Sequence, residues 1–196
     1  MFSQVPKNLS MLVNLMYLDI SNNLFDIYEI DFSTMTQLTR LYIKGGECSG
    51  RMEEQPIDES LCLLVKLEEL SFNMTKLMSL PDEIGNLVNL TSLNVDGSCL
   101  SELPESITRL TGLIELLAYG SAFECLPKNF GNLSALTNLG LKGNCHLLTL
   151  PDSFTSLTQL CTLGLPGPNS FVKPPGYANF LIHLEKSGCV YEESDM

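Results

Sequence analysis

The sequence has no hydrophobic run as long as the roughly 18 residues that a membrane-spanning helix requires. Its first residues, MFSQVPKNLS, lack both the basic segment and the apolar segment of a signal peptide. Basic residues are also scarce: 11 Lys and Arg stand against 23 Asp and Glu, for a formal net charge of -12. Nucleic acids and anionic membranes are bound by clustered Lys and Arg. We therefore expect neither of them as a partner.

Motifs of common catalytic sites are missing as well. There is no G-x-x-x-x-G-K-[ST] phosphate-binding loop, no G-x-S-x-G and no H-E-x-x-H. No two cysteines have C-x-x-C spacing, and only His146 and His183 could add imidazole ligands to a metal site. We interpret the neighbouring Cys145 and His146 as loop residues, because catalytic pairs are assembled across a fold. The sequence predicts a binding protein that is not an enzyme and has no metal or cofactor.

What is present is a repeated phrase, L-x-x-L-x-[LIVF]-x-x-[N/S/T], which recurs seven times with small variations. It begins at Leu15, Leu38, Leu67, Leu90, Leu113, Leu136 and Leu160, so the steps are 23, 29, 23, 23, 23 and 24 residues. Its apolar residues at alternate positions are typical of a short strand. Units of this length stack so that neighbours share one core.

A second motif, L-P-x-x-[IF]-x-x-L, stands between these phrases, for example from Leu80 to Leu87 and from Leu103 to Leu110. Its spacing of three predicts a helical or 3-10 turn, and a proline suits the start of such a turn. The polar residue after each strand can bind backbone groups of the neighbouring loop. Those residues are Asn23, Thr75, Ser98, Ser121 and Asn144, whereas Gly46 and Pro168 would interrupt the series.

Such units resemble leucine-rich repeats. They predict an α/β fold: a leucine-rich repeat solenoid (horseshoe) with a concave parallel sheet of about seven strands and convex short helical or 3-10 turns. Residues 1–165 would form the array, which begins in the middle of a repeat, and residues 166–196 a C-terminal capping helix and an acidic tail. The abrupt start suggests a fragment or the tail of a longer protein. The longest step holds a Gly- and charge-rich insertion at 45–56, expected to be an exposed protrusion.

The stretches 80–100 and 103–123 are similar to the repeats of plant intracellular (nucleotide-binding, leucine-rich repeat) disease resistance proteins. This resemblance implies a segment that follows a nucleotide-binding domain, senses a ligand and restrains the receptor in the defence response. Scaffold proteins of the Ras group carry almost the same repeat, so a free-standing intracellular adaptor for signalling proteins is one alternative. Substrate-recognition repeats attached to an enzyme such as a ligase or kinase are another.

The seven cysteines are an odd number, and we expect them to be buried, reduced thiols of a cytoplasmic protein. Cys99 and Cys145 should pack inward after their strands. A disulfide framework in a secreted protein is the alternative. Four sequons would suit that alternative, but three of them have a repeat leucine at their middle position and are interpreted as chance matches. They begin at Asn8, Asn73, Asn89 and Asn132.

The residues on either side of each inward leucine should point to the concave side and contact a protein ligand. The predicted contact residues are Tyr17, Arg40, Tyr42, Lys44, Glu69, Asn94, Asp96, Glu115, Leu117, Tyr119, Gly140 and Lys142. Gly140 and Gly164 have no side chains, so they should leave a shallow trough beside Leu117 and Tyr119. A large apolar side chain of the partner would anchor in that trough.

Overall fold

The computed structural model describes residues 6, 8–23, 30–44, 57–75, 77–167 and 172–193. Its strands are β1 (Tyr17–Asp19), β2 (Arg40–Tyr42), β3 (Glu69–Ser71), β4 (Ser92–Asn94), β5 (Glu115–Leu117), β6 (Asn138–Gly140), β7 (Thr162–Leu165) and β8 (Val190–Glu193). Its 3-10 turns are η1 (Leu9–Met11), η3 (Glu59–Leu63), η4 (Ile84–Asn86), η5 (Glu105–Arg109), η6 (Phe130–Asn132) and η7 (Asp152–Ser156), and α1 spans Tyr177–Lys186.

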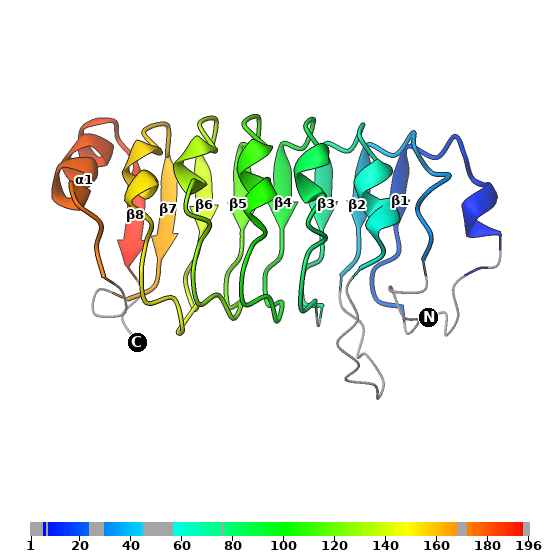
Figure 1. Cartoon of the computed structure of the whole chain (residues 1–196), viewed down its shortest axis with the longest axis horizontal. Coiled ribbons are helices and arrows are strands. Elements are labelled where there is room, and N and C mark those ends of the chain that lie inside the picture. Colours follow the sequence, from blue (N-terminus) through cyan, green and yellow to red (C-terminus); the bar gives the residue numbers. More distant parts are fainter. Residues whose placement is uncertain are drawn as a thin grey trace.

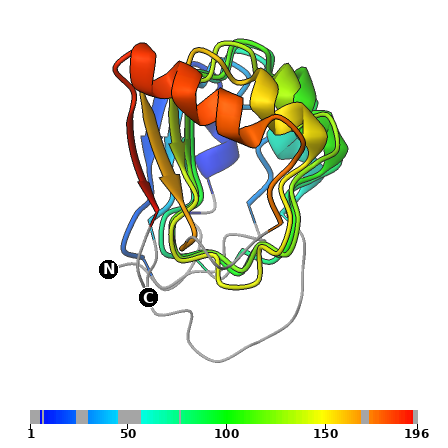
Figure 2. The same ribbon diagram turned by 90° about the vertical axis from the view of Figure 1, so that its left-hand side faces the viewer.

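The strands lie side by side in chain order and form one parallel sheet (Figure 1). The inward leucines pair across neighbouring strands, for example Leu93 with Leu116 and Leu116 with Leu139. Viewed from the C-terminal end, the coils superimpose, with the sheet on one side and the 3-10 turns on another (Figure 2). The predicted solenoid with a parallel sheet and convex 3-10 turns is therefore confirmed.

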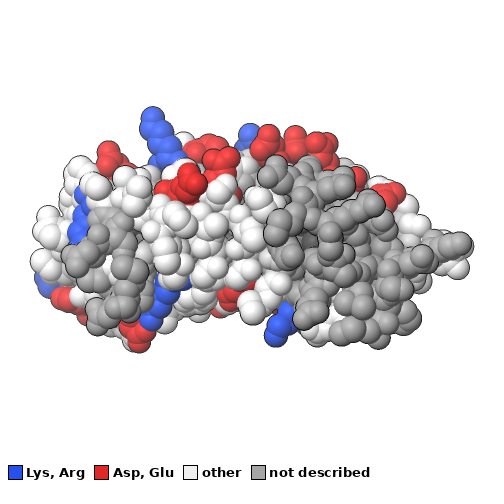
Figure 3. Space-filling model, turned by 90° about the horizontal axis from the view of Figure 1, so that it is seen from below, with Lys and Arg blue, Asp and Glu red and all other residues white. Residues whose placement is uncertain are grey.

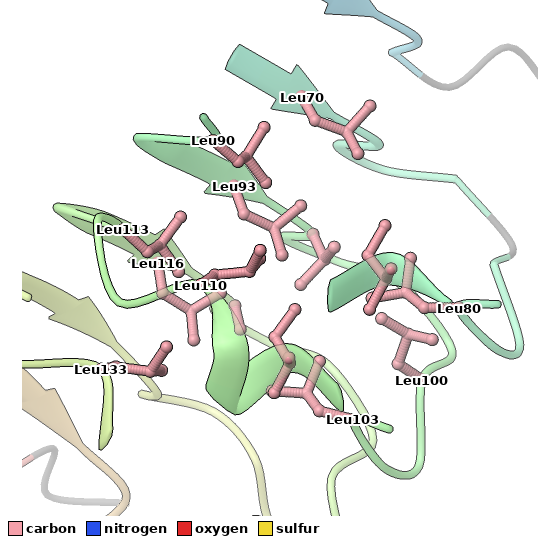
Figure 4. Close-up of a cluster of buried hydrophobic side chains, with 14 of the residues drawn as sticks. Leu70, Leu80, Leu90, Leu93, Leu100, Leu103, Leu110, Leu113, Leu116 and Leu133 are labelled. Carbon is pink, nitrogen blue, oxygen red and sulfur yellow. The ribbon is translucent and has the colours of Figure 1, made fainter. Parts of the chain in front are cut away.

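Leucines from both halves of each repeat fill the space between the sheet and the 3-10 turns. Leu93 and Leu116 come from strands, whereas Leu80, Leu103 and Leu110 come from the convex half, and their side chains meet in one cluster (Figure 4). All of them are buried. Full burial stabilises a leucine by about 1.5–3 kcal/mol relative to an exposed one, so the shared core holds the coils together.

Adjacent turns on the convex side approach so closely that only glycine fits at two places. A Cβ atom on Gly85 would overlap the carbonyl oxygen of Ser106, and one on Gly131 would overlap that of Ser153. The Gly131 amide instead donates to the Ser153 hydroxyl at 3.1 Å. These contacts join consecutive coils on the side opposite the sheet.

The predicted bonds to a neighbouring repeat are confirmed at Ser121 and Asn144, whereas the Asn23 and Thr75 side chains donate to carbonyls of their own repeat. The Ser121 hydroxyl lies 3.1 Å from that of Ser98 and donates to the Val95 carbonyl at 2.9 Å. Thr75 donates to the carbonyl of Phe72 at 2.7 Å. Asn144, which has no exposed surface, makes three bonds to backbone groups of two repeats. Gly46 and Pro168 lie outside the described residues, as does the insertion at 45–56.

The C-terminal region adds a strand that the sequence analysis did not predict. Helix α1 lies across the end of the array, where Phe180 packs against Phe154 with ring centroids 5.8 Å apart (Figure 2). After it, β8 pairs in parallel with β7. The expected sheet of about seven strands thus has eight in the described chain, and part of the expected acidic tail, Glu192 and Glu193, belongs to the sheet. Tyr191 takes the register position of an inward leucine, opposite Leu163.

Candidate binding face

The outward side of the sheet, which we call the open face, consists of the residues that flank the inward leucines. In β1, for instance, Leu18 is buried between exposed Tyr17 and Asp19. Parallel pairing places equivalent residues of successive strands next to one another. All twelve predicted contact residues lie on these strands or within two residues of their ends, and all except the buried Gly140 are at least partly exposed.

The first group on this face lies at its N-terminal end. The Tyr17 and Tyr42 rings are tilted, with centroids 5.6 Å apart, and the Arg40 guanidinium carbon lies 5.5 Å from the Tyr17 centroid. The Tyr42 hydroxyl donates to the Glu69 carboxylate. That bond raises the pKa of Tyr42 to about 12, with smaller contributions from burial and from the charge of Glu69. The group thus presents one exposed cation beside two aromatic rings.

The central group is acidic. Glu115 accepts a hydrogen bond from the Ser92 hydroxyl at 2.9 Å, and Asp96 accepts one from the Tyr119 amide at 2.7 Å. Burial raises the pKa of Asp96 above its ordinary value, although the amide bond acts in the opposite direction. Because these carboxylates are partly shielded from water, a cationic group of a ligand would interact with them more strongly than with carboxylates in bulk solvent.

The prediction of an open trough at Gly140 and Gly164 is wrong, because the side chains of Tyr119 and Lys142 fill this space. A Cβ atom on Gly140 would overlap the Tyr119 ring and lie 2.8 Å from its hydroxyl oxygen. A Cβ atom on Gly164 would lie 3.2 Å from Cγ of Lys142 and 3.3 Å from the Tyr119 ring. Both glycines are buried, while Tyr119 keeps 39% of its surface exposed. The absence of Cβ atoms lets Tyr119 and Lys142 lie flat across the neighbouring strands.

Glu192 of β8 belongs to the open face but was not among the residues predicted from the sequence. The Lys142 side chain crosses Gly164 and forms an ion pair with Glu192 of β8. This contact lowers the pKa of Glu192. No leucine phrase marks residues 190–193, so the only available signal was the alternation of Val190, Tyr191 and Glu192, with one residue inward and two outward.

The cysteines differ from expectation in their burial. Of those described, only Cys62 is fully buried, and burial raises its pKa to about 12. Cys99 and Cys145, expected to pack inward, are exposed, as are Cys125 and Cys161. The turns bury Ser98 and Asn144, and the residue that follows each of them, Cys99 or Cys145, faces solvent. None of the described cysteines forms a disulfide.

Neither a metal centre nor a membrane-spanning helix is found in the described part of the chain. No three His, Cys, Asp or Glu residues there gather closely enough to hold a metal ion. Its helices are all too short or too polar to cross a bilayer. On the side seen in Figure 3, described Lys and Arg side chains are scattered, mostly along the margins.

Comparison with known proteins agrees with this geometry. A family model described as "Leucine-rich repeat region" matches residues 46–163. No curated protein matches the sequence significantly. A leucine-rich repeat protein of Leptospira interrogans is similar in structure, with a TM-score of 0.71 and 23% identity over 97% of this chain. This chain spans about half, 51%, of that protein.

Two further solved structures share the fold. The leucine-rich repeat domain of the type III effector XopL has a TM-score of 0.71 and 22% identity, covering 97% of this chain and 72% of that one. The ectodomain of the Arabidopsis thaliana receptor kinase GASSHO1/SCHENGEN3, solved with CASPARIAN STRIP INTEGRITY FACTOR 2, has a TM-score of 0.59 and 22% identity. It matches 88% of this chain and 22% of its own. At these identities the similarity is one of fold alone.

Proposed function

This chain belongs to the leucine-rich repeat family, and on that premise we propose that it is a protein-binding module whose ligand contacts the open face. The family is generally a protein-interaction fold rather than an enzymatic one. The observation that carries the proposal is the in-register row of outward side chains, which joins exposed tyrosines and charges from successive strands into one surface. Aromatic and arginine side chains supply much of the energy at such interfaces.

The order of charges along this face supports a particular kind of ligand. Arg40 and Lys44 are exposed at the N-terminal end, and Glu69, Asp96 and Glu115 follow toward the centre. A protein with an acidic segment beside a basic one would match this order and associate faster than a neutral one. The overall charge of -12 makes a protein a better partner than nucleic acid or an anionic membrane.

Capture of interacting proteins by the full chain, compared among matched variants, tests the site. Leu117→Arg places a large cation in the middle of the open face, whereas Val88→Arg makes the same change at an exposed residue outside the strands. We expect a genuine partner to be retained by Val88→Arg and lost by Leu117→Arg, with Tyr119→Ala weakening binding about tenfold or more. A partner that tolerates Leu117→Arg but is lost by Val88→Arg would place the site elsewhere.

We further infer that the chain is the ligand-sensing, autoinhibitory repeat segment of a cytoplasmic immune receptor of the plant type. The similarity of stretches 80–100 and 103–123 to those receptors supports this role. Exposed thiols such as Cys99 and Cys145 fit a reducing compartment. Sequencing the transcript upstream of residue 1 tests it. A nucleotide-binding domain is the expected result, whereas a catalytic domain or an ordinary start site would contradict it and favour an enzyme's substrate-recognition repeats or an adaptor.

A further inference from the structure

Two cysteines that are far apart in sequence lie next to each other at one end of the sheet. In the β7–β8 register Thr162 pairs with Val190, so Cys161 and Cys189 are the aligned residues one position earlier. The Val190 amide donates to the Cys161 carbonyl at 2.8 Å, which fixes this alignment. Aligned residues on neighbouring parallel strands have Cα atoms about 4.8 Å apart. Disulfides span Cα distances of about 4.4–6.8 Å and Cβ distances of about 3.5–4.5 Å, so the backbone spacing suits a bond and the two Cβ atoms have to approach slightly.

The same position in other repeats indicates where a side chain there points. The Thr39 hydroxyl reaches the Met16 carbonyl at 3.0 Å, Thr91 reaches Glu68 at 3.0 Å and Thr137 reaches Ile114 at 3.3 Å. In each case the γ atom contacts the aligned residue of the preceding repeat. Cys189 holds the position of these threonines relative to Cys161, and its side chain is partly buried against the core. The Cys161 thiol lies 3.7 Å from the Gln159 carbonyl oxygen, so it has to turn toward Cys189 for a bond to form.

We propose that Cys161 and Cys189 are a redox-responsive pair that forms a reversible disulfide and locks β8 onto β7. The pair differs from the other described cysteines because its two members occupy the same register position on paired strands. Burial raises the pKa of Cys189, and the electrostatic influence of the neighbouring Cys161 adds to this effect. Cysteine disulfides in reducing compartments are typically transient and redox-sensing.

The oxidant is a low-molecular-weight disulfide such as oxidised glutathione. The exposed Cys161 thiolate attacks one glutathione sulfur, forming a mixed disulfide and releasing one glutathione thiolate. The Cys189 thiolate then attacks the Cys161 sulfur, forming the intramolecular bond and releasing the second glutathione. The two cysteine protons end on the two released glutathiones, so the pair is oxidised by two electrons and one glutathione disulfide is reduced.

The bond would close a loop that contains α1, so it would hold both α1 and β8 against the array. Strand β8 carries Glu192, the ion-pair partner of Lys142 on the open face. Oxidation would therefore keep this end of the face in its present arrangement, and reduction would let β8 open more readily.

The test uses the full chain incubated with reduced and oxidised glutathione at graded ratios. No Arg and no cleavable Lys lies between residues 143 and 185, so trypsin leaves Cys145 and Cys161 in one peptide. The experiment therefore uses the Cys145→Ser variant, in which a bridge from this peptide can only come from Cys161. We expect a peptide that links Cys161 to Cys189, with the loss of two hydrogens and no retained glutathione. Cys189→Ser should instead stop with one glutathione on Cys161.

Hydrogen exchange of the Val190 amide gives the second readout. It should slow at least about tenfold on oxidation, because opening of β8 would require motion against the cross-link. Retained glutathione on both cysteines, a bridge from either one to a different cysteine, or a 161–189 bridge that leaves this exchange rate unchanged would each overturn the proposal.

Discussion

The buried amide of Asn144 offers a sharp test of how the coils are held together. Its side-chain nitrogen donates to the carbonyls of Ala118 and Leu141, both at 2.8 Å, and its oxygen accepts from the Phe123 amide at 3.2 Å. Asn144→Ala removes all three bonds at a site with no exposed surface. A net hydrogen bond contributes roughly 1 kcal/mol, and each buried group left unpaired costs about 1–3 kcal/mol. Three unpaired groups correspond to about 3–9 kcal/mol. Losses above about 5 kcal/mol are exceptional for single substitutions, so we expect the free energy of unfolding to fall by about 3–5 kcal/mol.

Equilibrium urea unfolding, followed by circular dichroism, measures this loss. The matched control is Asn89→Ala, because Asn89 is also an amide that donates to a backbone carbonyl, that of Val65 at 2.7 Å, but it is exposed. Water can replace that bond, so the control should cost less than about 1 kcal/mol. Equal losses in the two variants, or a loss below about 1 kcal/mol for Asn144→Ala, would refute the view that these buried bonds tie neighbouring repeats.

Three further predictions concern packing and titration. Gly131→Ala should lower the free energy of unfolding by about 1–3 kcal/mol, because the added Cβ atom would overlap the Ser153 carbonyl oxygen. Gly112→Ala is the control in the same urea assay and should be close to neutral, since its Cβ atom would lie 3.9 Å from its nearest neighbour, the Val88 carbonyl oxygen. The pKa of Tyr42 is raised from 10.0 to about 12, so the stability that its hydrogen bond to Glu69 contributes is present below pH 10 and is lost as pH rises toward 12. Titration of tyrosine absorbance should show one phenol that ionises late, and Tyr42→Phe should abolish this step. Cys62, buried with a pKa of about 12, should react with a thiol reagent at neutral pH only after unfolding, and reaction as fast as that of the exposed thiols would contradict its burial.

Local sequence determined the repeating part of this protein. The inward position of Leu93, Leu116 and Leu139 follows from alternation within each short phrase, because a strand places every second side chain on the same face. The polar series was equally predictable at Ser121 and Asn144, since each of these residues stands at a constant distance after its strand. Such features depend on one repeat and its neighbour, which are copies of the same pattern.

Tertiary structure alone decided the features that join unlike segments. Strand β8 pairs with β7 across α1, and nothing in residues 190–193 repeats the leucine phrase that would have marked them. The position of Tyr119 over Gly140 depends on the space that one strand leaves for a side chain of another. The exposure of Cys145 depends on which side of a turn faces solvent. Periodicity predicts which face a residue occupies, but the direction of its side chain along that face is set by the atoms of the adjacent coil.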